Sequence, residues 1–311
     1  MEHRLPLDAK ATGLMFMLCT IWSLQQIALK AVGQDVSPML QIALRSGAAL
    51  LLVAAFMRWR KEPFDWAAWR PGCVVGALFG LEYLCVGEAL RLTSAGHTVV
   101  FLYTSPIFAA IGLHAKLPAE RLSTVQWGGI VLAFLGVAYA FLGGGNAAAG
   151  VSLLGDFLAL LGGAAWGATT VAIRTTRLSS TAPNQTVLYQ LGGAFVLLLP
   201  AAVLMGQTYF KPSALVWASL AYQTFIMSFL SLLIWFWLLR HYLASRLGVF
   251  TFLTPVLGVV LGAVLLGEPL EPRFVVGAAM VLLGITTVSL HTSLREGWQR
   301  LRVLVGSRPE P

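Results

Sequence analysis

The sequence contains few charged residues. Of its 311 residues, 11% are Asp, Glu, Lys or Arg, whereas 58% are hydrophobic. A soluble globular protein carries about 25% charged residues, so this chain lacks the side chains needed to cover a surface that faces water. Together with a mean hydropathy of +0.78, the composition predicts a protein that is embedded in lipid.

Cysteine is scarce as well. Cys19, Cys73 and Cys85 all lie in apolar runs, where a free cysteine behaves as a small hydrophobic residue. Their odd number and their placement argue against a disulfide framework.

Three motifs of energy-coupled or catalytic proteins are missing. The chain has no Gly-Lys-Ser/Thr phosphate-binding loop, no His-Glu-x-x-His zinc pattern and no Gly-x-Ser-x-Gly nucleophile elbow. Their absence argues against an ATP-driven pump and gives an intramembrane enzyme little support. We therefore expect no catalytic residues, no metal, no cofactor and no obligate protein partner.

Long apolar runs are the main feature of the chain. A helix needs about 20 residues to cross about 30 Å of hydrocarbon, and helices are the only plausible spanning elements because strand-like alternation is absent. The sequence predicts an all-α integral membrane protein with ten transmembrane helices. The predicted spans are Ala11–Ala31, Pro38–Met57, Cys73–Ala89, His97–Ala115, Val125–Leu142, Leu153–Ile173, Thr186–Met205, Ala214–Leu239, Leu247–Leu266 and Phe274–Leu290.

The cations are distributed unevenly around these spans. If the N-terminus is inside, 16 of the 21 Lys and Arg residues fall in cytoplasmic segments, and Arg45 lies within a span. The outer segments hold Lys30, Arg91, Lys211 and Arg273. This distribution follows the positive-inside rule. It predicts an inner (plasma) membrane protein with both termini cytoplasmic, and it explains the net charge of +8 without nucleic acid.

The same topology assigns the segments outside the spans. Residues 1–10 form a cytoplasmic N-terminus, 143–152 a periplasmic linker and 291–311 a basic cytoplasmic tail. The stretch Leu294–Val305 has an apolar helical face, so it is either an interfacial helix or part of a disordered tail.

The two halves of the chain resemble each other. The offset between matched residues begins at 144 and stays between 145 and 149 at the later landmarks, which predicts two repeats over 11–142 and 153–290. The matched landmarks are Trp22 with Trp166, Gly47 with Gly192, Ser105-Pro106 with Thr254-Pro255, and Glu120, Gly129 and Gly136 with Glu268, Gly277 and Gly284. Five spans are an odd number, so the second repeat is inverted. Inverted repeats are typical of secondary transporters, although duplication could also build a stable bundle, as in some channels.

Over about residues 11–291 the sequence resembles the drug/metabolite transporter superfamily, EamA-type. The resemblance rests on Thr20–Gly33, Ala164–Arg174, Thr93-Ser94-Ala95 leading into Thr104-Ser105-Pro106, Glu120-Arg121-Leu122 and Gly267-Glu268-Pro269-Leu270. It implies a ten-helix transporter with a central cavity, often an exporter of amino acids or related metabolites. The motifs say little about the cargo.

Two ionisable residues lie inside predicted spans, where charge is costly and is a default sign of function. Arg45 lies in the second span and Glu82 near the middle of the third, at similar depths. They could form a structural ion pair or snorkel, with Glu88 as a rival partner. Alternatively, Arg45 binds a cargo carboxylate, or Glu82 binds an amine or a coupling proton.

Polar and aromatic residues in mid-span are further candidates for a binding site. We select Trp22, Gln25, Tyr83, Tyr103, Trp166 and Gln190 from a set that also includes Gln26, Tyr189, Gln223 and Trp235. An aromatic, weakly polar cavity would suit amphipathic or zwitterionic molecules. Many of these residues could instead fill the space between helices.

The remaining polar residues near span ends have simpler explanations. Lys30 and Arg174 are expected to be snorkelling anchors. Asp156 is expected to cap its helix, and His97 and His114 to be interfacial.

Pro106 and Pro255 stand near the centres of the two matched spans four and nine. A proline removes a backbone hydrogen bond and kinks its helix. The pair predicts either two fixed bends or two hinges.

These features together favour a secondary transporter that exports an amino acid or similar small amphipathic metabolite by alternating access, with a proton as the candidate coupling ion. The alternatives are a passive channel or facilitator for small solutes, and an intramembrane enzyme.

Overall fold

The computed structural model describes residues 9–118, 121–142, 152–242, 247 and 250–287. Its regular elements are helices, and Val36 and Phe210 form an isolated antiparallel bridge. The predicted tail and most of the predicted N-terminal segment and linker lie outside the described residues, as does Glu120.

The described residues of the first half include six α-helices and the 3-10 helix η1. They are α1 (Ala9–Ala31), α2 (Pro38–Arg60), η1 (Trp66–Ala68), α3 (Trp69–Leu92), α4 (Ala95–Leu102), α5 (Ser105–Lys116) and α6 (Thr124–Leu142). The second half contains α7 (Leu153–Thr175), η4 (Arg177–Ser180), α8 (Pro183–Leu204), α9 (Ala214–Ala221), η5 (Tyr222–Leu230), α10 (Ser231–His241) and α12 (Leu253–Leu266). A last helix spans Pro272–Thr287.

Seven helical segments of the described chain are long and apolar enough to cross a membrane. Three further apolar helices are shorter: Thr124–Ala140, Leu253–Leu266 and Pro272–Thr287. The prediction of an all-helical membrane protein is therefore confirmed. The exact number of ten spans stays a prediction, because the shorter helices do not reach the length of a span on their own.

Helix α2 shows how local sequence sets the helix ends. Ser37 precedes it, and the Ser37 hydroxyl accepts a hydrogen bond from the Leu40 N–H at 3.1 Å. Pro38 occupies the first turn, where its missing N–H costs nothing. The helix ends at Lys61, which adopts a left-handed conformation with φ of 52°. The N–H of Lys61 bonds back to the Arg58 carbonyl.

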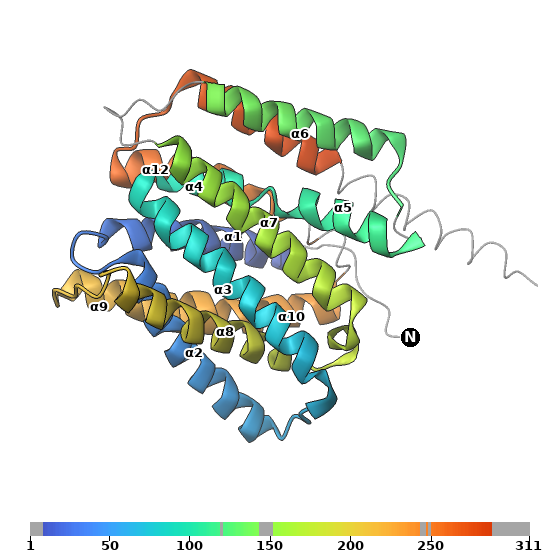
Figure 1. Cartoon of the computed structure of the whole chain (residues 1–311), viewed down its shortest axis with the longest axis vertical. Coiled ribbons are helices and arrows are strands. Elements are labelled where there is room, and N and C mark those ends of the chain that lie inside the picture. Colours follow the sequence, from blue (N-terminus) through green and yellow to red (C-terminus); the bar gives the residue numbers. More distant parts are fainter. Residues whose placement is uncertain (1–8, 119–120, 143–151, 243–246, 248–249, 288–311) are drawn as a thin grey trace, which may run out of the picture.

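Figure 1 shows α6 and the last helix along one side of the bundle, with α2 and α8 toward the opposite side. Glycines allow close contacts in both regions. A Cβ on Gly136 would come within 2.7 Å of the Gly277 carbonyl oxygen, and one on Gly129 within 2.8 Å of the Gly284 oxygen. The contacts are reciprocal between matched positions of the two halves, as a two-fold relation would require.

Predicted spans four and nine are both interrupted near their middles. The fourth consists of α4 and α5, separated by Tyr103 and Thr104, and Pro106 lies in the first turn of α5. In the ninth, α12 begins at Leu253 after a turn at 251–252, and Pro255 is its third residue. Each proline thus starts a second half-helix, where it is tolerated.

Candidate functional site

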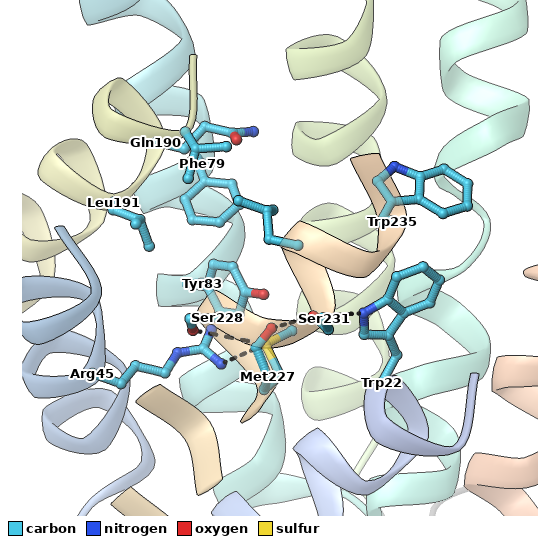
Figure 2. Close-up of a pocket in the computed structure, with 12 residues that line it drawn as sticks. Trp22, Arg45, Phe79, Tyr83, Gln190, Leu191, Met227, Ser228, Ser231 and Trp235 are labelled. Carbon is cyan, nitrogen blue, oxygen red and sulfur yellow. Dashed lines mark hydrogen bonds between the residues drawn. The ribbon is translucent and has the colours of Figure 1, made fainter. Parts of the chain in front are cut away.

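A cavity of about 180 Å³ opens between six helical segments near Arg45. Figure 2 shows Arg45 and Tyr83 on one side, the indoles of Trp22 and Trp235 on the other, and Met227 between them. The lining residues are Trp22 of α1; Arg45 of α2; Phe79 and Tyr83 of α3; Val187, Gln190 and Leu191 of α8; Met227 and Ser228 of η5; and Ser231, Leu232 and Trp235 of α10.

Arg45 is the cation of this cavity, and it is only 2% exposed. Its Nη1 donates to Gln223 Oε1 at 2.7 Å and contacts Met227 Sδ at 3.6 Å. The guanidinium carbon lies 4.6 Å from the centre of the Tyr83 ring, in cation–π contact. These groups fix the position of the guanidinium, and all of them are uncharged.

Gln25 of α1 completes the setting of Arg45. With its amide oxygen turned toward the guanidinium, Gln25 accepts from Arg45 Nη1 at 3.1 Å, from Nη2 at 3.2 Å and from the Tyr83 hydroxyl at 3.1 Å. The opposite orientation would set amide donors against guanidinium donors. The backbone carbonyl of Gln25 accepts from Gln223 Nε2 at 2.9 Å, so the two glutamines brace each other.

The ion pair considered between Arg45 and Glu82 is not formed. Among the described residues, no carboxylate oxygen lies within 4.0 Å of an Arg45 nitrogen. Successive helical residues point about 100° apart, so when Tyr83 faces the guanidinium its neighbour Glu82 points elsewhere. Glu82 is 3% exposed and does not line the cavity, and its Oε2 is buried without a hydrogen-bond partner. The rival partner Glu88 pairs with Arg91 at 2.8 Å instead.

The walls of the cavity are largely aromatic. Trp22 and Trp235 meet edge to face, with ring centres 5.6 Å apart, and the Trp22 indole N–H donates to Ser231 Oγ at 3.3 Å. Phe79 and Tyr83 pack at 4.8 Å on the α3 side. Such walls offer apolar area and ring faces, with hydroxyl and amide groups at a few points.

The segment η5 (Tyr222–Leu230) is a π-helix. Its wider turn shifts the register of the side chains that follow, and such segments are frequent at functional sites. Here the π-helix carries Gln223 to Arg45 and Met227 and Ser228 into the cavity. The Tyr222 hydroxyl ties it to α1 by donating to the Ile21 carbonyl at 2.5 Å.

The structure brings together part of the predicted site. Trp22, Arg45, Tyr83 and Gln190 line one cavity, and Gln25 supports Arg45 from behind. Tyr103 and Trp166 do not line it.

Those two rings meet edge to face at 5.3 Å and belong to the apolar interior between α4, α5 and α7. Their role is therefore packing in this conformation. The predicted hinges, Pro106 and Pro255, also lie outside the lining of the cavity.

Several lining residues were not selected from the sequence, among them Phe79, Met227, Ser228 and Ser231. A signal was present: Gln223, Met227, Ser231 and Trp235 recur at intervals of four residues. Fourfold spacing places residues on one face of a helix, and a stripe that mixes amide, thioether, hydroxyl and indole groups is unusual on a lipid-facing surface.

Known proteins resemble this chain in sequence and in fold. The profile of the EamA-like transporter family matches twice, over residues 10–142 and 153–290. "Uncharacterized transporter YoaV" of Bacillus subtilis is 24% identical over 85% of this chain and 91% of its own length. A Salmonella typhimurium protein named "Probable amino-acid metabolite efflux pump" is 24% identical over 88% of this chain and 92% of its own.

One solved crystal structure is 21% identical and aligns with a TM-score of 0.62, covering 91% of this chain and 97% of its own. At that identity the likeness shows the fold alone. The two family matches cover nearly the whole chain, and both lie in segments rich in apolar helices. The chain belongs to the EamA-like transporter family and is a multi-pass membrane transporter.

Proposed function

We propose that this transporter is a secondary carrier that exports an amino acid or a similar small amphipathic metabolite, and that the cargo binds in the cavity at Arg45. The observation that carries the proposal is the state of Arg45. A guanidinium that is 2% exposed lines a cavity, and the groups that hold it are neutral. Glu82 interacts with Arg45 only at longer range. A buried cation without a counterion in contact is costly, so the position is one where a cargo carboxylate would be stabilised.

The geometry of the Arg45 guanidinium suits a carboxylate. The guanidinium is planar and presents its donors in a fork that matches two carboxylate oxygens. Its Nε is buried without a hydrogen-bond partner, so a donor remains available. Gln25, Gln223 and Tyr83 keep the fork in place before the cargo arrives, which lowers the entropy lost on binding.

The aromatic walls suit the side chain and the ammonium group of the proposed cargo. Trp22, Trp235 and Phe79 supply apolar area for a side chain, and their ring faces can attract an ammonium group. Glu82 is another buried ionisable residue, and we propose that it binds a coupling proton or the amine of the cargo. The name of the Salmonella typhimurium relative supports an amino-acid metabolite as cargo and efflux as the direction.

The symmetry of the chain supports transport by alternating access. The family profile matches both halves, and the glycine contacts of α6 and the last helix are reciprocal. Helical interruptions before Pro106 and Pro255 occupy matched positions. If the second half is inverted, as we propose, one cavity can open alternately to either side by exchanging the conformations of the halves.

A counterflow experiment tests the proposal. Full-length protein is reconstituted into liposomes loaded with one unlabelled amino acid at a time, and uptake of the same labelled amino acid is followed. We expect a transient accumulation above equilibrium for at least one amino acid with an apolar or aromatic side chain. Arg45→Gln should abolish it, whereas Lys211→Gln, at an exposed position, should leave it unchanged.

A passive channel gives a different result. It equilibrates label without overshoot and without saturation, and that outcome would overturn the carrier proposal. Overshoot that is equal in the wild type and in Arg45→Gln would keep the carrier but remove the cavity as its binding site.

A further inference from the structure

A second buried polar site lies between α4 and α7, away from the cavity at Arg45. It consists of His97 near the start of α4 and Asp156 in the first turn of α7, which are 4% and 2% exposed. His97 Nδ1 lies 2.9 Å from Asp156 Oδ2 and 3.0 Å from Oδ1. Thr93 Oγ1 donates to Asp156 Oδ1 at 2.6 Å. Neither a simple helix cap nor an interfacial histidine, the roles expected from the sequence, describes this arrangement.

The two nitrogens of the His97 ring differ in their surroundings. Nδ1 faces the Asp156 carboxylate and therefore carries a proton that it donates. Nε2 is buried and has no hydrogen-bond partner. The ring is stacked on Phe274 of the last helix, with centres 3.6 Å apart and an angle of 10° between the planes. Nε2 is thus an unused proton acceptor held in an apolar setting.

A proton on Nε2 changes the net charge of the His97–Asp156 pair. With neutral His97, the pair carries the single negative charge of Asp156 in a buried place, stabilised by Nδ1–H and the Thr93 hydroxyl. A proton on Nε2 turns the pair into imidazolium and carboxylate, and it also gives Nε2 a hydrogen that has no acceptor in this arrangement. Histidine is the side chain whose charge ordinarily changes near neutral pH.

The site is connected to one end of the bundle, which the charge distribution predicts to be the outer end. The Thr93 carbonyl accepts a hydrogen bond from Lys30 Nζ of α1. Lys30 Nζ lies 3.6 Å from Glu268 Oε1, just beyond α12. Glu268 in turn accepts from the N–H groups of Ala95 at 2.6 Å and Gly96 at 3.0 Å, at the start of α4. Lys30, expected to be a snorkelling anchor, closes this end instead.

The other charged groups nearby are satisfied or separate. On α3, Glu88 pairs with Arg91 at 2.8 Å, and Glu82 lies deeper in the interior. Glu271 directly precedes the last helix, and its Oε1 is buried without a hydrogen-bond partner. Arg273 lies in the first turn of that helix, and α12 has no ionisable residue. Among the described ion pairs, the one at Asp156 is with His97.

We propose that His97 and Asp156 form a proton-binding site, with Nε2 of His97 as the atom that takes the proton, and that protonation favours opening of the end closed by Lys30 and Glu268. In the closed arrangement a proton on Nε2 would have no acceptor, and a buried donor without a partner is unfavourable. Opening lets water reach it. The coupling to opening rests on the proposed carrier function, whereas proton binding does not.

Proton binding is measured without any cargo. The full chain with ¹⁵N-labelled histidine is placed in lipid nanodiscs, and ring nitrogen signals are followed from about pH 5 to about pH 8. The chain has five histidines, and the signals lost in His97→Gln identify His97. We expect Nε2 of His97 to gain a proton within this range.

Asp156→Asn tests the partner. It should change the signal of His97 Nδ1, because the carboxylate that accepts the Nδ1 hydrogen bond is gone. His114→Gln is the matched control: His114 accepts from the Leu122 N–H elsewhere in the chain and should leave the His97 signals unchanged. A His97 ring that keeps one protonation state over the whole range would overturn the proton site. The protonation of His97 is followed in the wild type, and His97→Gln serves only to assign its signals.

Opening is measured by the distance between spin labels at Gln34→Cys and Leu270→Cys, in a background without native cysteines. Both positions are exposed, and they lie four residues beyond Lys30 and two beyond Glu268. A longer-distance population should grow between about pH 8 and about pH 5.5 and should be absent in His97→Gln. An unchanged distribution would overturn the coupling. The histidine signals and the spin-label distances are measured without cargo, so a failure of cargo counterflow would not change either result. The two proposals can therefore be tested separately.

Discussion

At the scale of single residues, Arg45 is held by acceptors that cannot neutralise it. Gln25, Gln223 and Tyr83 orient the guanidinium without supplying negative charge. A carboxylate in their place would stabilise the empty transporter but would compete with the cargo. Neutral bracing therefore keeps the cation both fixed and available, which is what a site for an anionic group requires.

Glu82 gives a prediction that separates its role from that of an ion-pair partner. Removing one member of a buried ion pair usually costs 3–5 kcal/mol, but Glu82 forms no such pair. Glu82→Gln should therefore lower the free energy of unfolding by less than about 1 kcal/mol. Chemical unfolding in detergent measures it. A loss near 3–5 kcal/mol would show that Glu82 has a charged partner after all, and a pH-dependent transport rate lost in this variant would support proton binding.

Asp65 gives a prediction about acid stability outside the spans. Its carboxylate accepts from Arg177 Nε at 2.6 Å and from the Ala67 N–H, and these bonds hold the pKa of Asp65 below its ordinary value. A lowered pKa means that the folded state favours the ionised form. The ionised Asp65 carboxylate therefore stabilises the fold at neutral pH, and this stabilisation is lost as the pH falls through the lowered pKa.

The comparison is between wild type and Asp65→Asn. The wild type should unfold at a slightly higher temperature near about pH 7, and the gap should narrow near about pH 3, below the ordinary pKa of an aspartate. The gap is small because both side chains are partly exposed and salt screens them. Equal gaps at the two pH values would contradict the role of the Asp65 charge.

A sequence can single out a residue whose type is unusual inside a membrane span. Arg45 stands out because charge inside a span is rare, and it lines the cavity. The roles of Tyr103 and Trp166 could not be predicted, because a mid-span aromatic ring looks the same whether it faces a cavity or another helix. The pairing of His97 with Asp156 depends on a contact 59 residues apart in the chain, which no local pattern encodes.

At the scale of elements, the interrupted spans are the parts best suited to move. Between α4 and α5 the backbone leaves the helix at Tyr103 and Thr104, and Pro106 cannot restore the missing bond. Pro106→Ala and Pro255→Ala return an N–H to each half-helix and should stiffen it. Each should change the maximal counterflow rate several-fold while changing the half-saturating concentration by less than about 2-fold. Unchanged counterflow rates in both variants would show that the two interruptions are fixed bends and not hinges.

The close contact between α6 and the last helix gives a prediction with a control on the same helix. A Cβ on Gly136 would lie 2.7 Å from the Gly277 oxygen, whereas one on Gly128 would meet nothing within 4 Å. Gly136→Ala should destabilise the protein by about 1–3 kcal/mol. Gly128→Ala should be neutral or stabilising by up to about 1 kcal/mol, because alanine favours a helix.

Unfolding in detergent measures both variants. Gly277→Ala should behave like Gly136→Ala, since the contact is reciprocal. Equal stabilities of Gly136→Ala and Gly128→Ala would show that the two helices can separate without cost.

The helices themselves follow from the sequence more closely than their ends do. Apolar runs predict most of the spans, but the π-helix at Tyr222–Leu230 depends on how α9 and α10 pack against α1 and α2. The same segment supplies Met227 and Ser228 to the cavity. The sequence therefore predicted a central cavity but only four of its twelve lining residues.

At the scale of the whole molecule, composition and repetition predicted the class of protein. Low charge, long apolar runs and two similar halves led to a membrane transporter, and the family matches confirm it. Orientation in the membrane is set by the cation distribution, and it stays a prediction. Under our proposal the choice of cargo depends on a few atoms around Arg45, which composition does not describe.

The most direct measurement compares a cargo acid with its own amide. Once counterflow has identified a transported amino acid, its carboxamide analogue is tested as a competitor against the wild type and Arg45→Gln. A charged hydrogen bond contributes about 1.5–3 kcal/mol, so the wild type should prefer the acid by about 10- to 100-fold. Arg45→Gln should lose that preference. If Arg45→Gln still prefers the acid by the wild-type factor, Arg45 does not hold the cargo carboxylate.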